Sequence, residues 1–204
     1  GTTKREYTPP TLNEEMLKAI EEKFGAALRE AINVENKSKI ASYAAMVACV
    51  QGPDGHAVTL HRTYLKEGRK ALGDQSKKLL SAGINGAAVR LDEATDELAL
   101  TEGIETALAV RLRTGKPTWA AINCGNLERI WIPEPVRRVC IYADNDADAE
   151  FAGQASAYIL AQRLVREAKK AGIHRTVEVF VPRQAGTDWA DIWLASLAKD
   201  KRAA

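Results

Sequence analysis

Short apolar runs alternate with longer segments of helical periodicity from residue 97 to residue 200, and this alternation constrains the fold more than any other feature. Strands that alternate with helices predict a mostly parallel α/β sheet that is covered on both faces. In such sheets, ligands bind beyond the carboxyl ends of the strands. The expected strands are 97–101, 118–122, 138–143 and 176–181, and the expected helices are 104–115, 126–131, 149–172 and 187–200.

The amino-terminal part of the chain has a different pattern, which mixes a helix with strands. Apolar residues recur at helical intervals over 11–32, which predicts an amphipathic helix. A strand at 56–65 is expected to form a hairpin with the segment around 46–50. Residues 66–86 are basic and Gly-rich, which indicates mostly loop, and 87–91 reads as a short strand. We expect a linker or the cut edge of a longer protein at 1–10, an α+β subdomain at 11–95 and an α/β domain at 96–200.

Composition excludes several classes of protein. The net charge of +2, from 29 basic and 27 acidic side chains, neither demands nor excludes a nucleic-acid partner. Cys49, Cys124 and Cys140 are far apart and lack CxxC spacing, so we expect neither a disulfide framework nor a zinc ribbon, but small core residues of a cytoplasmic protein. The longest uncharged stretch, 40–53, is too short to span a bilayer, and no signal peptide is evident, so no membrane association is expected.

Acidic residues follow three of the predicted strands at the point where each strand ends. Glu102 comes directly after the first strand, Asp144, Asp146 and Asp148 come after the third, and Asp188 follows the fourth. Because the carboxyl ends of parallel strands share one edge of the sheet, these side chains are expected to lie on that edge.

A divalent cation would explain such a cluster. Residues two apart on an extended chain point the same way, about 6.5 Å apart, so Asp144 and Asp146 can face one site. Carboxylates held together repel unless a cation neutralises them. Mg²⁺ prefers carboxylate oxygens and usually takes one or two of them, together with water and substrate phosphates. Two such ions about 4 Å apart can clamp an in-line phosphoryl displacement.

Each of these residues also has a structural alternative. Asp148 lies next to the expected helix start, where an acid complements the helix dipole. Asp188 can cap the last helix, with Asp191 at the third helical position. After the second strand, Asn126 either caps a helix or lines the site. Cys124 has no evident histidine partner, so it is not expected to be a nucleophile.

The segments "TEGIETALA", "IYADNDADAEFAG" and "GTDWADI" together resemble the Toprim domain of bacterial-type primases, type IA and type II topoisomerases and some nucleases. The family pattern is a glutamate after one strand, a DxD after a later strand and often a further acid. On this chain these are Glu102, Asp144 with Asp146, and Asp188. The resemblance implies a Rossmann-like core that binds Mg²⁺ or Mn²⁺ at these acids.

The arrangement is most similar to primases of phages and plasmids, in which a smaller subdomain precedes Toprim. "LHRTYL", "KKLL", "AVRL" and "PTWAAINCGNLERI" carry this likeness, which covers about residues 58–194. The chain departs from the pattern in two ways. Replicative bacterial primases have an acid four residues after the motif glutamate, where this chain has Thr106, and a zinc ribbon is missing.

A primase joins nucleotides into short primers on a single-stranded DNA template. The resemblance implies that Asp144 and Asp146 hold the metals, and that Glu102 lowers the pKa of the attacking hydroxyl as a metal ligand or general base. It also implies nucleoside triphosphates as substrates, and a helicase or relaxase domain in the same or another chain as a partner.

Basic side chains must face such a polyanionic substrate. Arg62 stands in a strand pattern where an apolar residue is expected, so it either contacts phosphate or forms a structural salt bridge. The lysines of the Gly-rich segment either contact nucleotide or are simply solvated. The candidates are Arg62, Arg69, Lys70, Lys77 and Lys78.

Two other functions remain open at this point. A metal-dependent Toprim nuclease would break DNA down without nucleotides, and a non-catalytic nucleic-acid-binding module would bind without either product. A topoisomerase is the least expected, because none of the five tyrosines lies in a recognisable catalytic context.

Overall fold

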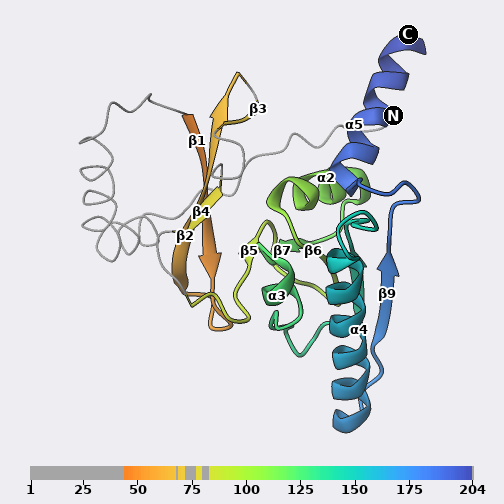
Figure 1. Ribbon diagram of the computed structural model, residues 1–204. Coiled ribbons are helices and arrows are strands. Elements are labelled where there is room, and N and C mark those ends of the chain that lie inside the picture. Colours follow the sequence, from red (N-terminus) through yellow and green to blue (C-terminus); the bar gives the residue numbers. More distant parts are fainter. Residues whose placement is uncertain (1–43, 68, 72–76, 80–82, 204) are drawn as a thin grey trace, which may run out of the picture. The chain divides into compact units, whose positions relative to one another are not determined.

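The computed structural model describes residues 44–67, 69–71, 77–79 and 83–203 (Figure 1). The linker expected at 1–10 and the helix expected at 11–32 lie outside these residues. By its internal contacts the chain divides into two units, Gly1–Met46 with Arg62–Leu80, and Val47–His61 with Ser81–Ala204. This division does not test a domain boundary between residues 95 and 96, which stays a prediction.

The first sheet contains β1 (Ala44–Gln51), β2 (Ala57–Lys66), β3 (Arg69–Lys70) and β4 (Lys77–Leu79). The expected hairpin is confirmed, since β1 and β2 are neighbours. The segment expected to be mostly loop contributes two short strands instead. β3 folds back antiparallel on β2 and β4 also pairs with β2, because the backbone of a long strand offers hydrogen-bonding groups on both sides.

The second sheet has five strands in the order β5-β7-β6-β8-β9. β6, β7, β8 and β9 are parallel, and β5 runs antiparallel beside β7. The predicted mostly parallel α/β sheet is therefore confirmed. The strands are β5 (Val89–Arg90), β6 (Glu97–Thr101), β7 (Thr118–Ala120), β8 (Arg138–Tyr142) and β9 (Thr176–Phe180).

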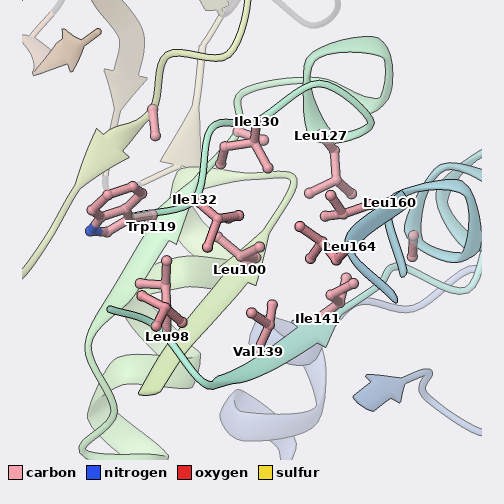
Figure 2. Packing of buried hydrophobic residues seen from close by; sticks show 14 of the residues in the cluster. Leu98, Leu100, Trp119, Leu127, Ile130, Ile132, Val139, Ile141, Leu160 and Leu164 are labelled. Carbon is pink, nitrogen blue, oxygen red and sulfur yellow. The ribbon is translucent and has the colours of Figure 1, made fainter. Parts of the chain in front are cut away.

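Helices cover both faces of this sheet (Figure 1). On one face, α3 (Cys124–Leu127) and α4 (Ala152–Ala171) pack over Leu100 and Ile141, as Figure 2 shows. On the other face, α2 (Ile104–Thr114) and α5 (Trp189–Ala203) pack against Tyr142 and its neighbours. Burying a Leu or Ile side chain of this kind contributes about 1.5–3 kcal/mol, so the apolar strand centres hold the layers together.

The expected glycine ends of α2 and α4 are confirmed, but the starts of α3 and α4 were wrong. α3 also ends at Leu127 instead of 131, and α5 covers Trp189–Ala203 instead of 187–200. Gly115 and Gly172 end α2 and α4 with φ of 69° and 67°, a left-handed conformation that glycine adopts without strain. α3 begins at Cys124 instead of 126, because the Asn123 side chain accepts a hydrogen bond from the Asn126 backbone N–H. α4 begins at Ala152 instead of 149, since the two residues before it have φ near +60°. In the described part of the chain, no helix combines the length and apolar character needed to cross a bilayer.

Candidate metal and nucleotide site at the carboxyl edge of the parallel sheet

Glu102 lies at the end of β6, between the strand and α2. Its side chain is half-buried, and its carboxylate Oε2 accepts a hydrogen bond from the Cys124 thiol at 2.8 Å. Its backbone carbonyl accepts a hydrogen bond from the Ile122 N–H at 2.7 Å. The glutamate is therefore held from two sides by the segment that follows β7.

Asp144 leaves the neighbouring strand beside Glu102. Thr101 of β6 pairs with Tyr142 of β8, so Glu102 and Asp144 leave their strands within one residue of the same register position. Adjacent strands are about 4.8 Å apart, so the two residues leave the sheet at neighbouring points of its carboxyl edge. Asp144 is half-buried, and its Oδ1 atom is buried. The expected common edge is confirmed, whereas a joint role of the two carboxylates stays a prediction.

Asp146 is held against the first turn of α4. Its Oδ2 accepts a hydrogen bond from the Gly153 N–H at 3.1 Å, and its own N–H donates to Gln154 Oε1 at 3.0 Å. A Cβ atom on Gly153 would lie only 2.9 Å from Asp146 Oδ2 and 3.1 Å from the Asp144 carbonyl oxygen. Only glycine lets the helix approach the two aspartates so closely.

Asn145, between the two aspartates, ties this loop to the loop after β9. Its N–H donates to the Thr187 carbonyl at 3.0 Å, its carbonyl accepts from the Gly186 N–H at 2.7 Å, and its Nδ2 donates to the Pro182 carbonyl at 2.8 Å. Its Oδ1 accepts from Gln154 Nε2 at 2.8 Å. The backbone and the side-chain nitrogen of Asn145 are thus hydrogen-bonded to the loop after β9. These bonds fix the course of the chain between Asp144 and Asp146.

The helix-dipole alternative for Asp148 was wrong, because α4 begins only at Ala152 and has no acid in its first turn. Asp146 occupies that role through its bond to Gly153. Asp148 is exposed, and its Oδ2 would lie 3.1 Å from a Cβ atom on Gly186. Metal binding by Asp148 stays a prediction.

The capping alternative for Asp188 is confirmed. Its Oδ1 accepts a hydrogen bond from the Asp191 N–H at 2.8 Å, and Asp191 Oδ2 accepts from the Asp188 N–H at 3.2 Å, a reciprocal cap. Asp188 Oδ2 also accepts from the Thr106 hydroxyl at 3.1 Å. Thr106, which stands where replicative primases carry an acid, is thus a hydrogen-bond donor to another acid. A metal role for Asp188 stays a prediction.

Cys124 is a protonated thiol beside the acids. Burial raises the pKa of Cys124 to about 12, and its hydrogen bond to Glu102 and the charges of Glu102 and Asp146 add to that rise. The hydrogen bond at 2.8 Å places Glu102 directly against this sulfur. A thiol with this pKa is not a thiolate nucleophile, in agreement with the sequence.

Asn126 does not line the site. Its Nδ2 donates to the carbonyls of Ala87 and Ala121, and its Oδ1 accepts from the Gly86 N–H, so the buried amide joins the chain around β5 to β7. The cap that the sequence offered to Asn126 belongs to Asn123.

The basic candidates belong to the other unit, and their contact with substrate stays a prediction. Arg62 lies on β2, half-buried, with its guanidinium carbon 5.5 Å from the Tyr64 ring centroid. It forms no ion pair within the described residues, so its structural salt-bridge alternative is not observed there. Lys70 and Lys77 are exposed, and the side chains of Arg69 and Lys78 lie outside the described part.

Sequence reasoning missed Asn145, Gly153 and Gln154, which position the aspartates. One signal was present, because glycine in the first turn of a long helix costs about 1 kcal/mol relative to alanine and calls for a reason. No such signal marked Asn145, whose contacts reach residues about 40 positions away.

Comparisons with known proteins agree with this fold. The family model described as Toprim domain matches residues 97–199, and residues 16–91 match a domain of unknown function (DUF7146). A search of the curated proteins finds no match. Among solved structures, the chain is similar to a DnaG primase catalytic domain bound to ssDNA, with 12% identity and a TM-score of 0.54 over 94% of this chain and 69% of that one.

A DNA primase domain from Pseudomonas aeruginosa is also similar, with 13% identity and a TM-score of 0.49 over 81% of this chain. This chain spans about half, 51%, of the length of that domain. At such identities the likeness concerns the fold alone. The Toprim match covers half of the chain, with Glu102, Asp144 and Asp146 at the ends of its strands, and the chain therefore belongs to the Toprim domain family.

Proposed function

We propose that this chain is the catalytic core of a DNA-dependent primase, which synthesises short primers on single-stranded DNA by metal-dependent nucleotidyl transfer. The observation that carries the proposal is the parallel pairing of β6 and β8, after which Glu102 and Asp144 follow on the same carboxyl edge of a Toprim sheet. The similarity of the fold to a primase catalytic domain supports it. The phage and plasmid type, the subdomains at 11–95 and 96–200 and the cytoplasmic location are parts of the same proposal.

The donor set fits Mg²⁺ or Mn²⁺. In the described part of the chain, Glu102 and Asp146 form no ion pair and accept hydrogen bonds only from a thiol and a backbone N–H. Among the described residues, no group of three or more His, Cys, Asp or Glu is arranged so that it could hold a metal ion. Mg²⁺ does not need one, because it commonly takes one or two carboxylates and completes its shell with water and phosphate.

Glu102, Asp144 and Asp146 would hold the metal, with Asp148 and Asp188 as further candidates. When bound, the metal would neutralise charge on the triphosphate and on the departing pyrophosphate. In primer synthesis the 3′-hydroxyl oxygen of one nucleotide attacks the α-phosphate of the next, and the bond to pyrophosphate breaks. Glu102 would draw the proton from the attacking hydroxyl, while the Gly153 N–H and Asn145 would hold the aspartates in place, so that little reorganisation is needed during the reaction.

The basic residues of the other unit supply the proposed phosphate contacts. Each phosphate that a Lys or Arg neutralises on single-stranded DNA contributes about −0.7 to the slope of log K against log[salt]. We expect Arg62→Gln and Lys78→Gln each to reduce that slope, measured by fluorescence anisotropy with a labelled single strand. The exposed Arg166→Gln on α4 is the control and should leave the slope unchanged. If both variants have the same salt slope as the unaltered protein, the proposed phosphate contacts of Arg62 and Lys78 are contradicted.

One assay tests the function. The chain is incubated with a single-stranded template, labelled nucleoside triphosphates and Mg²⁺ or Mn²⁺. Short labelled oligonucleotides support the primase. Breakdown of DNA without nucleotides indicates a nuclease instead, and DNA binding with neither product indicates a non-catalytic module. Adding a helicase or relaxase domain then tests the proposed partner.

A further inference from the structure

Cys124 contacts one oxygen of Glu102 and leaves the other one available. The thiol donates to Oε2 at 2.8 Å, and no other side chain in the described part of the chain donates to this carboxylate. Cys124 is the first residue of α3, and it is only half-buried. The contact therefore fixes the orientation of a carboxylate at the edge that holds Asp144 and Asp146.

The backbone around Cys124 is shaped for this contact. Ile122, at the end of β7, has φ of 81°, a left-handed conformation that is unfavourable for a β-branched residue. Its N–H nevertheless donates to the Glu102 carbonyl at 2.7 Å. Asn123 then caps α3, and the helix begins with the thiol directed at the glutamate. Three successive residues thus have conformations that join the end of β7 to Glu102.

We propose that Cys124 is a positioning residue that holds the Glu102 carboxylate through Oε2, so that Oε1 is presented to metal and substrate. The role of Glu102 toward metal and substrate rests on the proposed function, whereas the hydrogen bond does not. Cys124 itself touches no reacting atom in this proposal. Its removal should therefore act only through Glu102.

Mn²⁺ binding, measured by electron paramagnetic resonance without DNA or nucleotide, tests that dependence. Loss of one hydrogen bond to a charged group should weaken binding about threefold to tenfold in Cys124→Ala, and Cys124→Ser, which restores a donor, should recover most of the loss. In a Glu102→Gln background, Cys124→Ala should have no further effect. An unchanged affinity in Cys124→Ala, an equal loss in both backgrounds, or no recovery with serine would overturn the proposal.

Cys140→Ala is the matched control. Cys140 also lies near a glutamate, with its Sγ 3.6 Å from Glu97 Oε1, but it belongs to β8 and packs on the face of the sheet that α2 and α5 cover. Its loss should leave Mn²⁺ binding unchanged. If it weakens binding as much as Cys124→Ala does, the effect is general destabilisation and the proposal fails.

The S–H stretching band tests the contact independently of metal and activity. The Cys124 band, assigned by its absence in Cys124→Ala, should move to higher frequency in Glu102→Gln because an amide accepts more weakly than a carboxylate. A band that does not move overturns the proposal. If the unaltered protein binds no Mn²⁺, the metal-dependent function fails, and this band alone decides whether Cys124 holds Glu102.

Discussion

The two ends of the five-stranded sheet carry acids in different electrostatic settings. Toward the amino ends of the strands, Glu97 pairs with Lys116, and Arg138 lies 2.9 Å from Glu178 and 3.5 Å from Glu97. At the carboxyl ends, Glu102 and Asp146 have only a thiol and a backbone N–H as partners in the described part of the chain. Within the described residues, these strands therefore pair their acids with Lys and Arg at one end, whereas the carboxylates of Glu102 and Asp146 at the other end accept only from neutral donors.

The difference separates acids that the protein itself compensates from acids that we propose to bind metal. Burial by itself would raise the pKa of Glu97, but the hydrogen bond from Lys116 and the charges of Lys116 and Arg138 outweigh it, so this pKa is lowered. Such a carboxylate is already compensated within the protein. Acids held together without counter-ions cost free energy, and a bound cation or a metal–substrate complex removes that cost. Cation binding is therefore expected to be more favourable at the carboxyl edge than at the amino edge.

Replacing the glutamate at each end of β6 tests this comparison most strongly. Glu102→Gln should lower primer synthesis about 10²-fold to 10⁴-fold, because it removes the group proposed to take the proton. Glu97→Gln, with the same chemical change at the other end of the strand, should retain activity. Initial rates of primer synthesis, with circular dichroism to confirm folding, provide the measurement. Equal losses in the two variants would remove the distinction between the two ends.

Gly153→Ala sharpens the comparison at the carboxyl edge. The added methyl group would lie 2.9 Å from Asp146 Oδ2 and must displace that carboxylate or the helix. Misplacement of this size lowers activity about tenfold to a hundredfold. Stability should change little, because alanine favours a helix over glycine by about 1 kcal/mol and offsets part of the strain.

Gly125→Ala, in α3, is the control for that variant. A Cβ atom there meets only Asn123 Oδ1, at an ordinary 3.7 Å. Primer synthesis and urea denaturation should both remain near those of the unaltered protein. Normal activity in Gly153→Ala would show that the close approach of α4 does not position the aspartates.

Lys116→Met tests the amino end, where the smallest effect is expected. Since the pKa of Glu97 is lowered by folding, this carboxylate contributes stability above its unfolded pKa, near 4.3, and loses it as the pH falls through the folded value. Lys116→Met should reduce the free energy of unfolding by about 1 kcal/mol at pH 7, with a smaller difference at pH 3. Urea denaturation at the two pH values measures this. A difference that persists at pH 3 would assign the effect to packing, and activity should not change.

Much of the fold followed from local pattern. The strands of the second sheet, the four helices of the same unit and the glycine ends of α2 and α4 were all visible, because apolar periodicity and glycine conformation are local properties. The prediction that residues 66–86 are mostly loop was wrong at β3 and β4. The few residues of these strands become strands only because β2 lies beside them. The prediction that Asn126 caps a helix or lines the site was wrong for a similar reason, since its buried partners come from segments distant in sequence.

The sequence by itself determined that Glu102 and Asp144 stand at the ends of strands, because each follows an apolar run directly, and that Asp146 comes two residues later. Tertiary structure decided that β6 and β8 are parallel neighbours whose ends, before Glu102 and Asp144, lie on one edge of the sheet. It also decided that Asp146 rather than Asp148 meets the start of α4, and that Cys124 meets Glu102. The physical reason is that strand order and register are set by the packing of a whole sheet against its helices, whereas periodicity reports only which residues are buried.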